Sequence, residues 1–322
     1  MGSNFWKWKN KQARKEQDLK SKIESNCFHV YILQRRIKKM KNLFKTGIYL
    51  LCLTLLFLWV GYILGGRTGV IIAFIFAFGM NFISYWYSDK IVLAMYKAKP
   101  VSPNEYPELH NIVGELTRKM KIPSPKIYII DHLSSNAFAT GRDPEHAAVA
   151  VTTGILSMLS RDELEGVLAH ELAHVKNRDT LIQTVVATIA GAISMLAYMA
   201  RFAAISKGMG DRDRNDGGFI GLLIMSIVAP IAALMVQLAV SRTREYQADE
   251  SGAKISGKPY ALAGALKKLE LATKHVQMQA SPNTAHLFIV NPLRSGGFAT
   301  LFSTHPSIEN RVARLESMNI DE

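Results

Sequence analysis

Residues 166–179 read GVLAHELAHVKNRD, and the interpretation of the whole chain depends on this stretch. His170 and His174 stand four residues apart, and Glu171 directly follows the first histidine. On an α-helix this spacing puts the two imidazoles on one face, about 5–6 Å apart. Both could then bind one metal ion, with Glu171 on the side where a water molecule would be activated.

The alternative is a buried helix with two satisfied histidines and a solvent-facing glutamate. Ser160 and Glu163 have the spacing of a capping box, which predicts that a helix starts just before the motif. The longer motif HExxHxxGxxH is absent, because Asn177 and Thr180 occupy the positions of its glycine and third histidine. A catalytic zinc usually takes three protein ligands, so a third must come from elsewhere in the chain.

Apolar stretches flank this motif and also precede it. Four stretches have no charged residue over about the length that crosses a bilayer, which is roughly 20 residues. They are Thr46–Gly66, Thr68–Ser88, Thr180–Ala200 and Gly217–Ser241. The alternative for these stretches is buried core helices, above all for the third, which is rich in Ala and Thr. We expect four transmembrane helices arranged as two hairpins.

Positive charge is concentrated before the first apolar stretch. Residues 1–45 hold thirteen Lys and Arg against three acidic residues, which is +10 of the net charge of +13. Cytoplasmic segments next to membrane spans carry such an excess of basic residues, so we expect a cytoplasmic N-terminus. A basic chain also suggests nucleic-acid binding, but this placement favours a membrane surface, and we expect no nucleic-acid partner. Cys27 and Cys52 show neither metal-ligand spacing nor the pattern of a disulfide framework.

The chain is therefore expected to alternate between membrane and cytoplasm. The expected segments are a basic segment at 1–45, a hairpin at 46–88, the first part of a cytoplasmic domain at 89–179, a second hairpin at 180–241 with a loop at 201–216, and the second part of that domain at 242–322. Met40 lies directly before the first span, where a natural start would lie. We interpret residues 1–39 as an extension, or as the result of an upstream start, that does not carry the main function.

The cytoplasmic parts have the patterns of a globular domain. The expected elements are helices at 104–120, 259–280 and 306–318, strands at 126–130 and 147–152, and a turn-rich connection at 131–146 between the strands.

This topology selects the third metal ligand. The second expected hairpin begins just after the motif and ends just before Glu245, in the stretch SRTREYQADE. A hairpin would bring Glu245 to the same membrane face as His170 and His174. Asp249, four residues later, shares its helical face and could accept a hydrogen bond from a ligating histidine. The alternative is a solvated acidic helix face beside Arg242 and Arg244.

Several spaced motifs together resemble one known family. HELAH (170–174) with NRD (177–179), SRTREYQAD (241–249), SNAFATG (135–141) and HPSIENR (305–311) are similar to the M48 metallopeptidases, in particular their bacterial membrane branch, the HtpX-type proteases. The resemblance covers about residues 40–319. It implies an α-helical integral membrane protein with a mainly α, zincin-like α+β metalloprotease domain on the cytoplasmic side.

The resemblance also implies an activity. It implies a zinc endopeptidase (one Zn²⁺ per chain) of the bacterial inner membrane that cleaves protein substrates, misfolded membrane proteins among them, in quality control and the stress response. Glu171 would be the catalytic base, and His170, His174 and Glu245 the zinc ligands. Asn136 would lie by the cleft, where an edge strand could pair with substrate, or in an ordinary turn-flanked strand. His305 would stabilise the oxyanion or simply start a helix. The other histidines are interpreted as surface or core residues, and a competing hypothesis is a non-catalytic membrane scaffold with a structural metal site.

Overall fold

The computed structural model describes residues 2–191, 193, 242–275, 284–290 and 306–318 of the chain. Residues 1–45 form one unit and residues 46–322 a second. The expected loop at 201–216 and the fourth expected span, Gly217–Ser241, lie outside the described residues.

The helix α1 (Gly2–Met95) carries both of the first two expected spans. Gly65 and Gly66 leave helical geometry, and Gly66 has a φ of +54°, which glycine adopts at little cost. The chain reverses there, and two segments, Thr46–Ile63 and Gly65–Met95, are long and apolar enough to cross a membrane. The second continues past the expected end at Ser88 because Val92 and Leu93 are buried against the globular part.

Small and polar residues bring the two halves of this hairpin together. A Cβ added to Gly61 would lie 2.5 Å from the carbonyl oxygen of Gly69, so the backbones approach closely only because glycine stands there. The amide of Asn81 donates a hydrogen bond to the Thr54 hydroxyl at 2.8 Å. Both are typical of helix pairs in membranes, where small residues permit contact and polar side chains join the helices.

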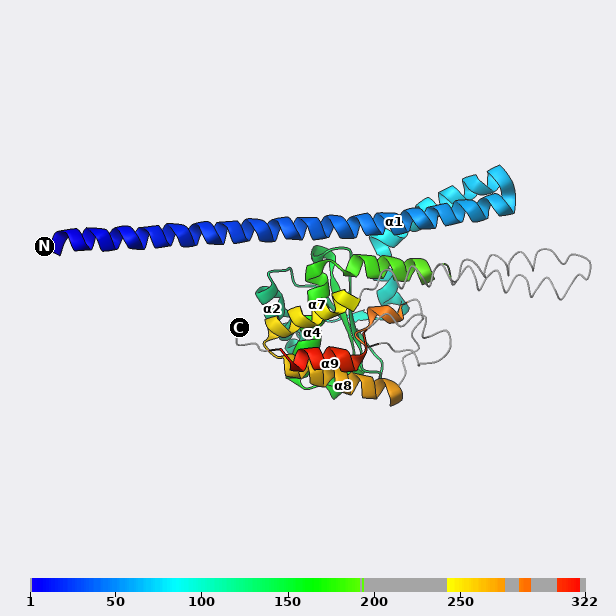
Figure 1. Ribbon diagram of the computed structural model, residues 1–322. Helices are drawn as coiled ribbons and strands as arrows, with labels where there is room; N and C mark the ends of the chain where they lie inside the picture. Colours follow the sequence, from blue (N-terminus) through cyan, green and yellow to red (C-terminus); the bar gives the residue numbers. More distant parts are fainter. Residues whose placement is uncertain (1, 192, 194–241, 276–283, 291–305, 319–322) are drawn as a thin grey trace, which may run out of the picture. The chain divides into compact units, whose positions relative to one another are not determined.

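The globular part has a small mixed sheet covered by helices (Figure 1). The strands are β1 (Lys99–Pro100), β2 (Lys126–Ile130), β3 (Ala137–Thr140) and β4 (Ala148–Thr152), in the order β1-β2-β4-β3. β2 and β4 are parallel, whereas β1 pairs with β2 and β3 with β4 in antiparallel fashion. The helical elements are α2 (Pro107–Met120), η1 (Pro144–His146), α3 (Thr153–Met158), α4 (Arg161–Asn177), α7 (Arg242–Ser256), α8 (Pro259–His275), η2 (Ala285–Leu287) and α9 (Ile308–Glu316).

The sequence expectations for these elements need three corrections. The connection 131–146 contains β3, whose four residues are all buried, so it is more than a run of turns. α2 starts at Pro107, three residues later than expected, because Ser102 and Glu105 form a capped turn before it. The expected helices at 259–280 and 306–318 are α8, described as far as His275, and the shorter α9.

The beginning of the third expected span belongs to the globular part. The helix Thr180–Gly191 starts two residues after the left-handed C-cap of α4 at Arg178. The Thr180 hydroxyl donates to the carbonyl of Gly141 at 2.8 Å, and the hydroxyls of Thr184 and Thr140 lie 3.0 Å apart. The first two turns of this helix are therefore fixed to the end of β3, next to the HELAH motif.

Candidate metal and catalytic site

The α4 helix presents the HELAH motif to the interior. Its capping box forms as the sequence predicts: the Ser160 hydroxyl accepts from the Glu163 N–H, and the Glu163 carboxylate accepts from the Ser160 N–H at 2.9 Å. His170, Glu171 and His174 are all buried, with exposed fractions of 5% or less. The glutamate therefore does not face solvent, as the simple buried-helix alternative requires.

Helix α7 brings Glu245 to these histidines. Glu245 Oε1 lies 3.4 Å from His174 Nε2, and Glu245 Oε2 lies 3.7 Å from His170 Nε2. One ligand atom from each of the three residues lies within 4.8 Å of the others. Gly252, two turns along α7, permits this approach, because a Cβ there would lie only 2.8 Å from the backbone nitrogen of His170.

The donor set fits a divalent cation. His170 Nδ1 lies 2.9 Å from a carboxylate oxygen of Asp249, which can only accept, so Nδ1 carries the proton and Nε2 has a lone pair. That lone pair faces His174 Nε2 at 3.2 Å and the Glu245 carboxylate. Electron-rich atoms converging without water are unfavourable unless a proton or a cation lies between them. Two imidazole nitrogens and one carboxylate are a typical ligand set for Zn²⁺.

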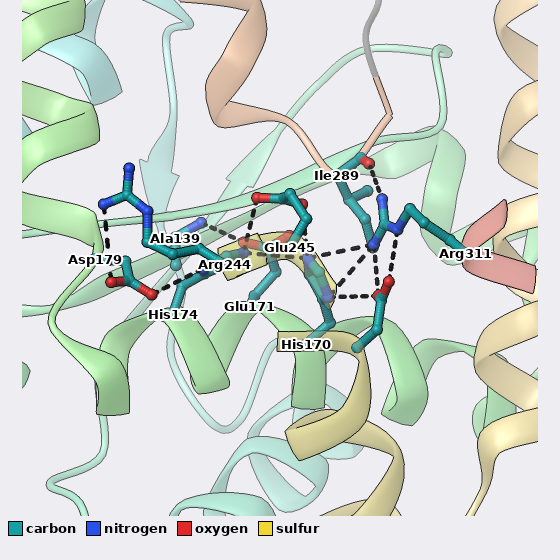
Figure 2. Close-up of polar contacts among 10 residues, drawn as sticks. Ala139, His170, Glu171, His174, Asp179, Arg244, Glu245, Ile289 and Arg311 are labelled. Carbon is teal, nitrogen blue, oxygen red and sulfur yellow. Dashed lines mark hydrogen bonds and ion pairs between the residues drawn. The ribbon is translucent and has the colours of Figure 1, made fainter. Parts of the chain in front are cut away.

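Asp249 contacts His170 and is bound in turn by Arg311. Figure 2 labels Arg311 beside His170. Arg311 donates from Nε and Nη2 to the two Asp249 oxygens at 2.8 and 2.7 Å, and its side chain is fully buried. Burial alone would raise the pKa of Asp249, but the charge and hydrogen bonds of Arg311 outweigh it and hold that pKa well below its usual range. Asp249 thus stays ionised. The contacts from Arg311 on α9 to Asp249 on α7, and from Asp249 to His170 on α4, fix the orientation of the His170 ring.

Asp179 and Arg244 form a second, looser support on the His174 side. Asp179 Oδ2 lies 3.6 Å from His174 Nδ1, which is an ion-pair distance rather than a hydrogen bond. Its other oxygen lies 3.9 Å from Arg244 Nη1. Burial by itself lowers the pKa of His174, but the charges of Glu245 and Asp179 outweigh burial and raise it to about 9. For His170, burial dominates and lowers the pKa.

Glu171 lies beside the three candidate ligands and is held by the sheet. Its Oε2 accepts a hydrogen bond from the Ala139 N–H at 2.9 Å, which joins it to β3 (Figure 2). Burial raises the pKa of Glu171 to about 8, and the neighbouring Glu245 adds to this effect. A buried carboxylate with a raised pKa, next to a group of candidate metal ligands, has the properties of a general base.

The remaining predicted residues have different outcomes. Asn136 is buried at the start of β3, where its side-chain amide donates to the carbonyl of Val290 at 2.9 Å. His305 lies outside the described residues. His286, which the sequence analysis assigns to surface or core, is buried and lines the small cavity beside His170, Glu171 and Glu245.

Arg311 has no role in the sequence analysis, although it ends a motif quoted there. A signal was present, since Arg311 ends HPSIENR (305–311), one of the motifs that carry the resemblance. Its contact with Asp249 could not be predicted, because the two residues are 62 positions apart.

The chain is similar to known proteins of one family. The model of "Peptidase family M48" matches residues 103–319. A "Protease HtpX homolog" of Desulfatibacillum aliphaticivorans is 55% identical over 277 residues, which are 86% of this chain and 89% of the relative. A protein of the same name from Pyrococcus furiosus is 54% identical over 278 residues, 86% of this chain and 96% of the relative.

A solved structure, Ste24p of S. mikatae, matches with 20% identity and a TM-score of 0.48, over 88% of this chain and 66% of that one. The family match spans both helices that carry the candidate ligands, and the high identity extends over most of the chain. The chain therefore belongs to peptidase family M48, the metallopeptidases that its motifs resemble.

Proposed function

We propose that this membrane-bound metalloprotease is a zinc endopeptidase in which His170, His174 and Glu245 hold one Zn²⁺ and Glu171 is the general base. The observation that carries the proposal is the convergence of the three ligand atoms within 4.8 Å, with Glu171 next to them. Zinc supplies a Lewis acid that polarises the scissile carbonyl and acidifies water.

The residues of the chain then move the proton. Glu171 takes a proton from the attacking water as its oxygen adds to the scissile carbonyl carbon, and passes that proton to the leaving nitrogen as the C–N bond breaks. Glu171 must be ionised to take this proton, and the positive charge of a cation bound by the three ligands would favour the ionised form. The Ala139 N–H keeps the carboxylate on the side of the cluster that faces β3.

The substrates are expected to be proteins of the membrane in which the enzyme lies. The two apolar halves of the α1 hairpin support membrane insertion, and the basic residues before the first span support a site that faces the cytoplasm. The names of the curated relatives, "Protease HtpX homolog", support a protease of this type. The resemblance to that branch implies a role in quality control of misfolded membrane proteins at the bacterial inner membrane. The same proposal includes two further membrane-spanning helices, at Thr180–Ala200 and Gly217–Ser241.

The non-catalytic scaffold is the less favoured hypothesis. A structural metal site needs neither a buried glutamate beside the ligands nor an open coordination position. Here Glu171 is buried at some electrostatic cost, as its raised pKa shows, and a dedicated backbone hydrogen bond orients it.

The test compares zinc-loaded wild type with Glu171→Gln on an unfolded membrane-protein substrate in detergent. We expect Glu171→Gln to keep the zinc content of the wild type and to lose cleavage by about 10²–10⁴-fold, the usual contribution of a general base. Glu165→Gln is the matched control, since Glu165 lies on the same helix and is buried away from the metal cluster. Cleavage by Glu171→Gln at the wild-type rate would refute the proposal.

A further inference from the structure

A short segment of the chain lies along β3 at the mouth of the site. This segment, which we call the strap, comprises residues 284–290: the turn η2, then Phe288 in an extended conformation, within a bend that runs to Val290. β3 is the last strand of the sheet, and within the described part of the chain no other strand pairs with its outer edge. The Ile289 N–H donates to the carbonyl of Ala137 on that edge at 3.2 Å.

The backbone of the strap is bound by side chains of the site. Arg311 Nη1 donates to the carbonyl of Ile289 at 3.0 Å, and the Asn136 amide donates to the carbonyl of Val290 at 2.9 Å (Figure 2 shows the first contact). Both peptide groups of Ile289 are thus bound, the N–H by the sheet edge and the carbonyl by Arg311. Arg311 also binds Asp249, which orients His170.

Extended peptides are recognised in this way. Main-chain hydrogen bonds to an exposed sheet edge supply affinity, and pockets for alternate side chains supply selectivity. In the strap the Ile289 side chain is buried in the main apolar core, and Phe288 packs on the opposite side against Phe138. The strap therefore occupies a position on the sheet edge, at the Ala137 carbonyl, where the backbone of a substrate could pair.

The strap also fills the space that a substrate needs. The cavity beside the candidate ligands has a volume of only about 10 Å³, and its walls include His286, Leu287, Phe288 and Ile289 of the strap. That volume holds about one water molecule. A polypeptide cannot reach Glu171 along this edge while the strap is in place.

We propose that residues 284–290 are an internal pseudosubstrate, which occupies the peptide-binding edge of β3 and must be displaced before a protein substrate binds. This inference rests on the proposed function. Among the described residues, only the Ile289 N–H joins the strap backbone to β3, and β3 keeps its four pairs with β4. Displacement therefore leaves the sheet intact.

The strap is anchored by side chains whose loss should release it. Phe288 makes edge-to-face contacts with Phe138 and Tyr96, with ring centroids 5.2 and 5.0 Å apart. The Tyr96 hydroxyl also contacts the hydroxyl of Thr284. Phe138, Tyr96 and Thr284 are not among the candidate metal ligands, so the zinc content of each variant checks that the metal site is unchanged.

The experiment measures kcat/KM of the zinc-loaded full chain in detergent for an extended fluorogenic peptide. Phe288→Leu leaves an apolar side chain in the core but removes the aromatic contacts. We expect it to raise kcat/KM about three- to tenfold, because weaker binding of the strap increases the fraction of molecules in which the strap is displaced and substrate can bind. Tyr96→Phe should have a smaller effect of the same sign. Tyr128→Phe is the control and should leave kcat/KM unchanged, because Tyr128 packs against the same apolar cluster but, among the described residues, its ring is not one of those in contact with the Phe288 ring.

A capped peptide with the sequence TAHLFIV (residues 284–290) provides a second measurement. It should compete with substrate, and it should inhibit Phe288→Leu at lower concentration than wild type, whereas a scrambled peptide should not inhibit. The strap proposal is overturned if both anchor variants, with wild-type zinc content, cleave no faster than wild type and the peptide does not inhibit. If cleavage by all variants also persists after Glu171→Gln, the proposed function itself is overturned.

Discussion

His170 Nδ1 and Asp249 Oδ1 lie 2.9 Å apart, and this contact joins α4 to α7 directly behind the candidate metal ligands. Arg311 completes the arrangement from α9, so three helices that are distant in sequence together fix one imidazole. A ligating histidine gains both orientation and basicity from such a carboxylate. Three predictions concern these supporting residues and the packing that holds them.

Asp249→Asn should weaken zinc binding about 10–100-fold, the usual effect of losing a carboxylate behind a ligating histidine. The amide removes the negative charge that both His170 and Arg311 contact. Competition with a chromophoric chelator measures the affinity. Glu250→Gln, at the next and exposed position of α7, should bind zinc as tightly as wild type. Equal affinities for Asp249→Asn and wild type would contradict the assigned role.

Asp179→Asn should also weaken zinc binding, but by less than Asp249→Asn. The Asp179 contact with His174 is 3.6 Å long, against 2.9 Å for Asp249 with His170, and a longer contact orients the ring less firmly. The same chelator competition ranks the two variants. A larger loss for Asp179→Asn would show that the His174 side is the more important support.

Gly252→Ala should separate α7 from α4. The new Cβ would lie 2.8 Å from the His170 nitrogen, which is backbone that cannot turn aside, so the helices must move apart. We expect a loss of stability of about 1–3 kcal/mol and weaker zinc binding. Gly114→Ala is the matched control, because a Cβ at that helical glycine meets nothing within 4 Å. It should be neutral or slightly stabilising.

The pH dependence of stability should reveal the buried Glu171. In metal-free protein the pKa of Glu171 is raised from 4.5 to about 8. Between these pH values the unfolded chain releases the proton and the folded chain keeps it, so the wild type loses stability as pH rises, on the order of 1 kcal/mol per pH unit. Glu171→Gln lacks this contribution, whereas the contribution of His174, whose pKa is raised to about 9, is present in both proteins.

Denaturant unfolding of metal-free protein at pH 5 and pH 7.5 measures this difference. The stability of Glu171→Gln relative to wild type should increase from the lower to the higher pH. A difference that is the same at both pH values would show that Glu171 is ionised in the folded protein throughout this range.

The sequence predicted those parts of the structure that depend on local patterns. The capping box at Ser160 forms, and the helix it starts carries His170 and His174 one turn apart. The juxtaposition of Glu245 followed from an argument about topology, that a hairpin returns the chain to the side it left. The strand at Ala137–Thr140 agrees with the strand that the resemblance implies at Asn136, whereas the residue pattern alone indicates a turn-rich connection, because four residues of small and aromatic type give no clear period.

Contacts over long sequence distances had no signal of this kind. The binding of Ile289 by Arg311, and of Val290 by Asn136, depends on how α9 and the strap pack against β3. Periodicity cannot report such packing, because each partner is an ordinary buried residue within its own segment. His286 was assigned to surface or core for the same reason, and only the folded chain shows that it lines the cavity.

The most direct test of the account is the zinc content of purified Glu245→Gln, measured by mass spectrometry beside wild type and Glu250→Gln. If Glu245 is the third ligand, wild type and Glu250→Gln should each hold about one zinc per chain, and Glu245→Gln should lose most of it because a neutral amide is a poor substitute for the carboxylate. A full complement of zinc in Glu245→Gln, with the wild-type rate of cleavage, would contradict the assignment of His170, His174 and Glu245 as one catalytic metal site.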